Sequence, residues 1–438
     1  MEMHEDKVLR ISSQLKGRRS TEPLTRKKKT VSHEVPKPND RKHTDEKLDI
    51  SDLDGIIHID PESRTCIAEP GATFEEVVDA AMRHGLVPAV VPELRTITIG
   101  GAVAGCSIES MSYVYGGFHD TCLEYEVVTA RGDVLICTPE NENRLVFQMM
   151  HGTFGTLGII TRLKFMLIPA KPFVKVVYEE YGSLREYMDA IWNHYTRRDV
   201  DFMDGIIHSK DKYILSAGHF VDTAPYTHNY DWMRVYYRST AERKEDYLKT
   251  PDYFFRYNKG VTNVLPKSFI GRFLFGRFTT SNNILRMAHA TKKVIPQTMI
   301  PITLDTFIPF SKMEEFMAWY GEEVDHFPLW CVPYRIVRKY EWLAEGFSEK
   351  IEDELFLDIA IYGMHRKDTE HYYRILEKKL YELGAIKTLI STNLYSEEEF
   401  WKIWNRDNYE LVKQQTDPDN IFRGLHEKTC QASRGLGR

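Results

Sequence analysis

Residues 96–120, TITIGGAVAGCSIESMSYVYGGFHD, form the segment whose residue types say most about chemistry. Glycine, alanine and serine dominate it, in a protein in which Asp, Glu, Lys and Arg make up 28% of all residues. Glycine lets backbone N–H groups come close to an anion or a flat ring, where a Cβ atom would collide. Flavin adenine dinucleotide (FAD) has both kinds of surface. The segment therefore favours a bound flavin over the alternative, close packing against another part of the backbone.

Two further glycine-containing stretches lie in the first part of the sequence, EPGATF (69–74) and GTFGTLG (152–158). No Gly-Lys-Ser/Thr follows either of them, so neither is a P-loop. The glycines of the second stretch are spaced GxxGxxG, whereas the dinucleotide fingerprint is GxGxxG. The sequence therefore predicts no Rossmann-type NAD site, and EPGATF taken alone is typical of a turn.

The composition sets limits on the class of protein. With 438 residues there is room for roughly two or three domains and for an internal active site. A hydrophobic fraction of 42% is ordinary for a globular protein, and a net charge of -6 gives no overall attraction to nucleic acid or anionic membrane. These values predict a small-molecule partner and no nucleic acid.

Cysteine usage and targeting signals point to an intracellular protein. The six cysteines form no CxxC pair, and no His cluster has metal-ligand spacing, so we expect neither a metal site nor a disulfide framework. No apolar run reaches the roughly 18 residues of a membrane span, and the first 30 residues are polar and basic. We expect a protein without a transmembrane span, either cytoplasmic or peripheral to an intracellular membrane.

Short elements surround the glycine segment. Residues 5–30 are typical of an amphipathic helix that runs into a basic surface loop, Arg26–Lys29. In residues 65–85 a strand and a turn lead into a helix, in which Thr73 and Glu76 form a capping box. The alternating segment 122–139 predicts a β-hairpin that turns at Gly132.

The composition changes at about residue 173. From there to about residue 400, helices alternate with strands rich in Tyr, Phe and Trp, which predicts a second α+β domain whose sheet presents one aromatic face.

The order of these motifs resembles a known family. IAEPGATFEEVV, TIGGAVAGCSIES, YGGFHDTCLEYEVVTARGDVL and GTFGTLGIITRLKFMLIPAK are similar to the flavin-binding domain of the vanillyl-alcohol oxidase and p-cresol methylhydroxylase (VAO/PCMH) superfamily. More narrowly, the sequence resembles the Δ24-sterol reductases, because FIGRFLFGR, WCVPYRI, ELFLDIAIYG and EEEFWKIW follow in the same order. The resemblance runs from about residue 7 to the last residues.

The resemblance implies an α+β, two-domain FAD-binding PCMH/VAO-type fold with an α+β cap domain. Residues 1–172 would form the FAD-binding domain and residues 173–400 the substrate cap, while the tail 401–438 would return to the FAD domain through DPDNIF (417–422). The implied protein is an FAD-dependent oxidoreductase of sterol biosynthesis and lipid metabolism, which reduces an isolated carbon–carbon double bond in the side chain of a sterol-like substrate. Its implied cofactors are non-covalent FAD and, as co-substrate, NADPH.

The resemblance also implies which residues contact the flavin. The first set is Thr98, Ile99, Gly100, Gly101, Gly105, Cys106, Ser107, Ile108, Glu109 and Ser110. The second set, on the other side of the cofactor, is Gly155, Leu157, Gly158 and Ile160.

This sequence departs from the family pattern in three places. It starts without the apolar span of the sterol reductases, which puts anchoring by a helix in doubt. The loop RKKKTVSHEVPKP (26–38) has no glycine, so Lys28, Lys29, Ser32 and His33 would supply donors to the diphosphate. His33 and Cys106 are the candidates for covalent flavin attachment, although a small buried Cys is commonly a packing residue.

Reduction of an isolated alkene needs a hydride at one carbon and a proton at the other. The candidate proton donors are Tyr115, His119 and Glu109 near the flavin, and Tyr334 and Tyr362 on cap strands. For the tyrosines the structural alternative is packing with a satisfied hydroxyl.

The segment SFIGRFLFGRF (268–278) has two interpretations. Its Phe269, Ile270, Phe273, Leu274 and Phe275 could form a rim that dips into a bilayer, or a core segment.

Two rival functions remain open. One is a soluble FAD-dependent oxidase or dehydrogenase of an alcohol or sugar acid, with the same fold used in the oxidative direction. The other is a binding protein that keeps the fold without turnover.

Overall fold

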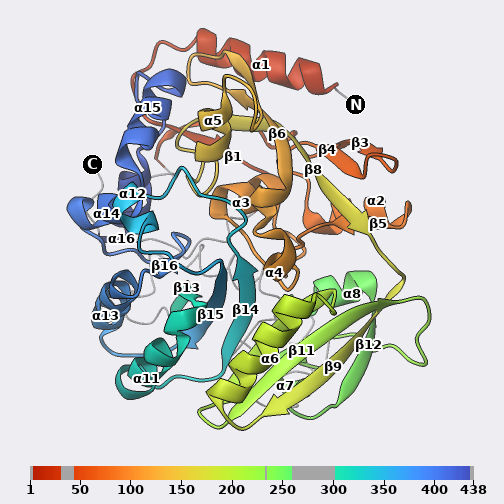
Figure 1. Cartoon of the computed structure of the whole chain (residues 1–438). Helices are drawn as coiled ribbons and strands as arrows, with labels where there is room; N and C mark the ends of the chain where they lie inside the picture. The colour runs from red at the N-terminus through yellow and green to blue at the C-terminus, as the bar shows by residue number, and fades with distance from the viewer. Residues whose placement is uncertain (1–2, 31–43, 232–233, 259–300, 435–438) are drawn as a thin grey trace.

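A computed structural model describes residues 3–30, 44–231, 234–258 and 301–434. In these ranges the strands form three sheets (Figure 1). Ser32, His33 and the whole of SFIGRFLFGRF lie outside the described residues, so the predictions made for them stay predictions. Among the described helices, none combines the length and the apolar character needed to cross a membrane.

The first sheet has six strands and holds the glycine segment. Its main path is β3-β4-β8-β6-β7, and β5 pairs with β8. The strands are β3 (Ile56–Asp60), β4 (Thr65–Ala68), β5 (Leu86–Pro88), β6 (Cys122–Val128), β7 (Val134–Cys137) and β8 (Ile159–Pro169). The helices and turns beside it are α2 (Phe74–Met82), α3 (Ile99–Gly105), α4 (Ser112–Tyr115), η2 (Phe118–Thr121) and α5 (Arg144–Met149).

Local sequence signals are confirmed in this part of the protein. Thr73 and Glu76 form the predicted capping box at the start of α2. Strands β6 and β7 form the predicted hairpin, and Gly132 at its turn has a φ of 80°, which favours glycine.

The N-terminal part begins with helix α1 (His4–Lys16) and a two-stranded parallel sheet of β1 (Leu24–Lys27) and β2 (Glu46–Asp49). The basic stretch Arg26–Lys29 was expected to be a loop, but Arg26 and Lys27 lie in β1, because this strand pairs with β2 and places Leu24 in a small core. That core also contains Ile421 and Phe422 from the tail.

The third sheet has eight strands in the order β12-β9-β11-β10-β14-β15-β13-β16. Its strands are β9 (Phe173–Tyr181), β10 (Phe202–Ser209), β11 (Lys212–Val221), β12 (Glu245–Lys249), β13 (Ile302–Pro309), β14 (Leu329–Arg335), β15 (Leu355–Met364) and β16 (Ile386–Lys387). The segments between them are α6 (Leu184–Arg197), α7 (Tyr236–Ser239), α8 (Thr250–Phe254), η4 (Phe310–Lys312), α11 (Met313–Glu323), α12 (Glu345–Ser348) and α13 (Thr369–Glu382).

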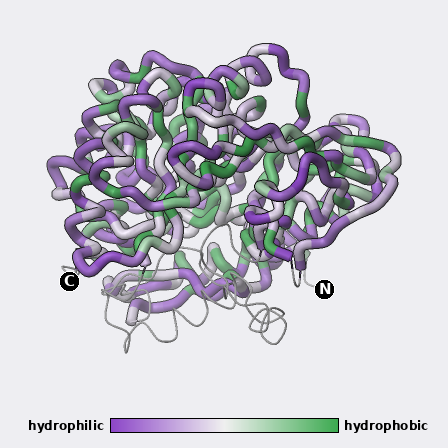
Figure 2. The backbone as a smooth tube through the Cα atoms, turned by 90° about the horizontal axis from the view of Figure 1, so that it is seen from below, coloured by the Kyte–Doolittle hydropathy of each residue, from purple (hydrophilic) through white to green (hydrophobic). Residues whose placement is uncertain are grey.

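The two faces of the eight-stranded sheet have different neighbours. Helices α6, α11 and α13 cover one face and share an apolar core with it (Figure 1). The opposite face carries Trp330, Tyr334 and Phe356 and belongs to the same core as α3 and the six-stranded sheet. The predicted aromatic face is therefore the one that meets the glycine segment. Figure 2 shows the more hydrophobic stretches towards the interior of the molecule.

The tail packs on the first sheet's side of the molecule. It consists of α14 (Glu397–Ile403), α15 (Arg406–Thr416), η5 (Glu427–Gln431) and α16 (Ala432–Arg434). Buried Lys413 donates to the carbonyl of Thr156 at 2.9 Å and pairs with Asp417 at 2.5 Å. These bonds attach the DPDNIF segment to the loop that precedes β8.

Candidate functional site

Helix α3 begins at Thr98, whose Oγ1 accepts a hydrogen bond of 3.2 Å from the N–H of Gly101. A Cβ atom at Gly100 would lie 2.5 Å from Cβ of Pro70, and the Gly100 N–H donates to the Pro70 carbonyl at 2.9 Å. The EPGATF turn therefore packs so closely against position 100 that a side chain would collide with it. Close backbone packing, and not a flavin, accounts for the glycine at this position.

The other end of α3 is open. The atom nearest to a Cβ built on Gly105 is Cγ2 of Ile390, at 3.7 Å. Cys106 follows as the C-cap in the left-handed conformation, with a φ of 53°. The glycine segment thus has two parts: its start packs on Pro70, and its end faces a pocket.

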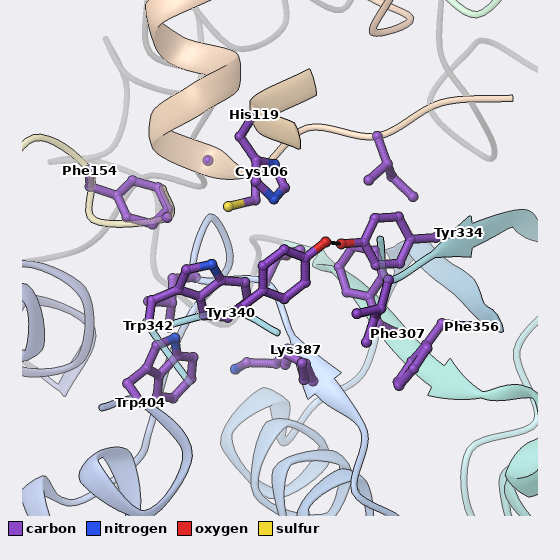
Figure 3. A pocket seen from close by; sticks show the side chains of 17 residues that line it. Cys106, His119, Phe154, Phe307, Tyr334, Tyr340, Trp342, Phe356, Lys387 and Trp404 are labelled. Atoms are coloured by element: carbon purple, nitrogen blue, oxygen red, sulfur yellow. Dashed lines mark hydrogen bonds between the residues drawn. The ribbon is translucent and has the colours of Figure 1, made fainter. Parts of the chain in front are cut away.

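This pocket lies between the end of α3 and the inner face of the eight-stranded sheet (Figure 3). On the side of the first sheet it is lined by Gly105, Cys106, Ile108, His119, Gly152 and Phe154. From the cap and the tail it is lined by Phe307, Tyr334, Ile336, Tyr340, Trp342, Phe356, Ile386, Lys387, Thr388, Leu389 and Trp404. Most of the lining is aromatic or aliphatic, which suits a flat ring or an apolar substrate.

His119 contributes polar atoms to this apolar pocket. Its side chain is 1% exposed, and neither ring nitrogen has a hydrogen-bond partner among the described residues. Nε2 lies 3.3 Å from Oδ2 of Asp120. Burial lowers the pKa of His119, and the Arg338 charge lowers it further against the opposing effect of Asp120. The ring is therefore neutral at pH 7 and leaves a nitrogen free for a ligand.

A series of hydroxyl groups leads from the pocket to a carboxylate. The hydroxyls of Tyr334 and Tyr340 are hydrogen-bonded to each other (Figure 3), and the Tyr340 hydroxyl donates to Oδ2 of Asp120 at 2.8 Å. Arg338 pairs with Oδ1 of Asp120 at 2.9 Å, and the N–H of Gly117 donates to Oδ2. Because Tyr340 donates to Asp120, the hydroxyl proton of Tyr334 points towards Tyr340 and away from the pocket.

The comparisons with known proteins agree with this site. A family model described as an FAD binding domain matches residues 39–138, which include α3, Cys106 and His119. The sequence is 26% identical to the Delta(24)-sterol reductase of Homo sapiens over 92% of its own length and 81% of the relative. It is 21% identical to the Delta(24)-sterol reductase of Pisum sativum over 98% of its length and 85% of the relative.

The chain resembles the Delta(24)-sterol reductases along most of its length. It is an FAD-dependent oxidoreductase of α+β fold. A shorter match, 27% identical over 31% of the chain, is to cytokinin dehydrogenase 5 of Arabidopsis thaliana.

The residues at the end of α3 fit an FAD. Gly105 leaves open space on the pocket side, and His119 has a buried nitrogen without a partner among the described residues. Burial raises the pKa of the Cys106 thiol well above its usual range, so this cysteine is a thiol at neutral pH.

Several predicted flavin residues lie away from the pocket. Ile99 is buried in the core and Ser107 donates its N–H to the Ala102 carbonyl. At Gly155 a Cβ atom would meet the guanidinium of Arg26, which donates to the Phe154 carbonyl at 2.8 Å. Leu157 and Gly158 lie in the same loop, with Leu157 fully buried, and Ile160 belongs to β8. Of the predicted set, the pocket brings together Gly105, Cys106 and Ile108 with the candidate catalytic residue His119.

Glu109 and Ser110 belong to a buried cluster, not to the pocket lining. The Arg256 guanidinium, with no exposed side-chain surface, lies 3.0 Å from Glu109 and 3.1 Å from Asp204. Trp330 and Tyr257 donate to Asp204 at 2.9 and 2.7 Å, and the Ser110 hydroxyl accepts from Tyr253. Burial raises the pKa of Glu109, and Arg256 offsets part of that rise. This cluster links the segment after α3 to the cap sheet.

Tyr115, the third candidate donor, ends helix α4 and is partly buried against the core. Burial raises its pKa, so its hydroxyl is neutral at pH 7. Tyr362 donates to Asp305. The donor roles of Tyr115 and Glu109 stay predictions.

Sequence reasoning missed a group of carboxyls on the cap side, Asp305 and Asp358, with Glu93 near them. A signal was present: each aspartate is the only charged residue inside an apolar strand pattern, ITLDTFIP and LFLDIAIYGM. An isolated charge at an inward position of a buried strand marks either a paired charge or a functional group.

Proposed function

We propose that this protein reduces an isolated carbon–carbon double bond in the side chain of a sterol-like substrate, with FAD as cofactor and NADPH as electron donor. The observation that carries the proposal is the aromatic pocket, which joins the end of α3 to the cap sheet. The names of the relatives supply the substrate class and the reaction.

Bound FAD would supply the hydride chemistry, because a flavin passes hydride between a nicotinamide and a carbon centre. Residues Thr98–Ser110 and Gly155–Ile160 are the proposed flavin-binding segments, with Gly105, Cys106 and His119 at the ring. We expect the flavin to be held without a covalent bond.

The pocket walls suit the electronic demand of this reaction. An isolated alkene has no carbonyl to accept charge, so its reduction passes through a transition state with positive character at one carbon. Aromatic faces such as those of Phe307, Tyr334 and Phe356 stabilise a cation through their quadrupoles by roughly 0.5–2 kcal/mol each. The same apolar walls exclude water from the reacting carbon.

The alternative is oxidation of an alcohol by the same fold, and one observation favours it. The hydroxyl series Tyr334–Tyr340 ends on the Asp120 carboxylate, an arrangement that suits removal of a proton from a substrate hydroxyl. The two reactions differ in what reoxidises the flavin.

The test is an anaerobic flavin titration of the purified protein. NADPH should bleach the flavin absorbance, and desmosterol should restore it, while cholesterol, which lacks the side-chain double bond, should not. Rapid recovery in air with no effect of desmosterol would refute the reductase proposal and support the oxidase. A colourless protein that binds no FAD would leave only a binding role.

The site itself can be tested by filling it. Gly105→Phe places a ring in the open space at the end of α3, and we expect at least a tenfold loss of flavin content. Gly346→Phe is the matched control, since Gly346 is exposed and has no atom within 4 Å of its Cβ position. Equal flavin content in both variants would place the flavin elsewhere.

We further propose that the apolar substrate is collected at a membrane surface by the segment SFIGRFLFGRF (268–278). Flotation of the protein with liposomes tests this: the association should weaken in Phe273→Ser with Leu274→Ser. Binding that is absent in the wild type, or unchanged in the variant, would contradict it.

A further inference from the structure

Two aspartates lie side by side on the inner face of the cap sheet. Strands β13 and β15 pair with Phe307 opposite Asp358 and Asp305 opposite Ala360. Side chains alternate between the faces of a strand, so Asp305 and Asp358 project to the same face as Phe307 and Phe356. Diagonal neighbours of this kind have Cα atoms about 7–8 Å apart. Since Phe307 and Phe356 line the pocket, the two carboxyls lie directly beside its aromatic wall.

Asp305 also contacts the pocket wall through a hydrogen bond. Its Oδ2 accepts from Oγ1 of Thr388 at 3.4 Å, and Thr388 lines the pocket. Its Oδ1 accepts from the hydroxyl of Tyr362. Asp305 is only 6% exposed. One residue of the pocket wall therefore separates this carboxyl from the pocket.

Asp358 accepts a hydrogen bond from the backbone of Thr306 but forms no ion pair with a described cation. It is 2% exposed, and its Oδ1 has no hydrogen-bond partner in the part of the protein that the structure describes. A buried ionised carboxylate without a cation is costly, so such a group instead holds a proton.

The charges around the pair are mostly negative. Glu93, from the segment between β5 and α3, acts on Asp358 and Tyr362, and Glu109 acts on Glu93. Arg256 acts on Glu93 less strongly than Glu109 and Asp305 do, and it is itself paired with Glu109 and Asp204. The ammonium of Lys387, on neighbouring β16, is hydrogen-bonded to Glu377 and to the Thr392 carbonyl.

These surroundings favour the protonated forms of Asp358 and Glu93 at neutral pH, and that of Asp305 up to about pH 6. Burial raises the pKa of Asp305 to about 6 and that of Glu93 to about 8. Burial, followed by the charges of Asp305 and Glu93, raises the pKa of Asp358 well above its usual range. A carboxyl kept neutral in this way is a far stronger acid than a tyrosine hydroxyl, and a pKa near the working pH is the best value for a general acid.

We propose that Asp305 and Asp358 form a proton-donating pair for the reduction. The proton passes through Thr388 in the pocket wall: the O–H bond of its hydroxyl breaks as the π electrons of the alkene form a C–H bond with that proton, and the hydroxyl oxygen takes the proton of the Asp305 carboxyl. Bound FAD would supply the hydride for the adjacent carbon, and the carboxylate left behind takes a proton from water before the next turnover. This proposal rests on the proposed function, because it assigns the proton of that reaction.

The test separates the two halves of the catalytic cycle. In Asp305→Asn and Asp358→Asn we expect wild-type flavin content and wild-type bleaching by NADPH. Reoxidation by desmosterol should slow by roughly 100-fold or more, the usual contribution of a general acid. Asp211→Asn, at an exposed carboxylate in the turn between β10 and β11 of the same sheet, should react as the wild type does.

The outcomes are distinguishable. If desmosterol reoxidises both Asn variants at the wild-type rate, the pair is not the proton donor, although the proposed function stands. If desmosterol never reoxidises the wild-type flavin, the proposed function fails first. If a variant misfolds, the pH dependence of the wild-type reoxidation rate is measured instead. This rate should fall as pH rises through the titration of Asp305 and Asp358. A rate that does not change with pH would overturn the proposal.

Discussion

Two groups of buried carboxyls lie at the same face of the cap sheet, and they differ in their neighbouring cations and donors. Asp204 and Glu109 share the guanidinium of Arg256 at 3.1 and 3.0 Å. Asp305 and Asp358 form no ion pair with any described cation. The comparison indicates that the role of a buried carboxyl depends on whether a cation lies next to it, and not on its position on the sheet.

The cation-containing group is also rich in donors. Trp330 and Tyr257 both donate to Asp204, and the Arg256 guanidinium lies 4.0 Å from the ring centre of Tyr253. Such a network fixes the segment after α3 against the cap, which is a positioning role. In the other group, Oδ1 of Asp358 has neither a hydrogen-bond partner nor an ion-pair partner among the described residues, and the pocket lies next to it, which suits chemistry.

The largest expected effect comes from removing the cation. Arg256→Met leaves two buried carboxyls uncompensated and should lower the free energy of unfolding by about 3–5 kcal/mol. Urea denaturation measures this. The control Arg335→Met removes a partly exposed pair with Glu354 and should cost at most about 1 kcal/mol. If Arg256→Met and Arg335→Met lowered the free energy of unfolding equally, the structural role assigned to Arg256 would be wrong.

A smaller effect follows from removing one donor. Trp330→Phe keeps the aromatic packing but deletes the N–H that donates to Asp204, and should cost about 1.5–3 kcal/mol. Trp192→Phe is the matched control, because the Trp192 side chain is 45% exposed. If Trp330→Phe lowered the free energy of unfolding no more than Trp192→Phe does, the Trp330 N–H would not stabilise the buried Asp204 carboxylate.

The smallest effect is expected where no described cation is present. Asp358→Leu replaces an unpaired buried acid with an apolar group of similar size and should change the free energy of unfolding by less than about 1 kcal/mol at low pH. A loss comparable to that in Arg256→Met would mean that Asp358 is a paired structural charge.

The pH dependence of the free energy of unfolding tests the same difference between the two groups of carboxyls. Unfolded carboxyls lose their protons near pH 4, whereas the folded protein holds those on Asp305 and Glu93 up to about pH 6 and 8. The folded state binds more protons in this window, so rising pH should destabilise it from about pH 4 to 8. Denaturation at several pH values should show a weaker decline in Asp358→Leu than in the wild type. A parallel decline in both proteins would contradict the expected role of this carboxyl.

Local parts of the fold could be predicted from sequence because their determinants are close together along the backbone. The capping box at Thr73 and Glu76 and the hairpin at Gly132 depend on residues a few positions apart. Gly100 shows the limit: its small size reflects contact with Pro70, which only the folded protein reveals.

The site was predictable in part for the same reason. Gly105, Cys106 and Ile108 follow one another in the glycine segment, and they do line the pocket. Arg256 could not be connected with Glu109 and Asp204 from sequence, because the three come from segments that are far apart in the sequence. The pairing of Asp305 with Asp358 likewise depends on the register of two strands that are not consecutive.

The most direct measurement of the central claim is the infrared spectrum of the protein labelled with ¹³C at its aspartate carboxyls, recorded from acid to alkaline pH. We predict a protonated carboxyl C=O band that persists at neutral pH and loses intensity in Asp358→Asn but not in Asp211→Asn, together with a band that is lost in Asp305→Asn and fades in the wild type above about pH 6. A wild-type spectrum that shows only carboxylate bands at neutral pH would contradict the account, because the pair would then have no proton to deliver.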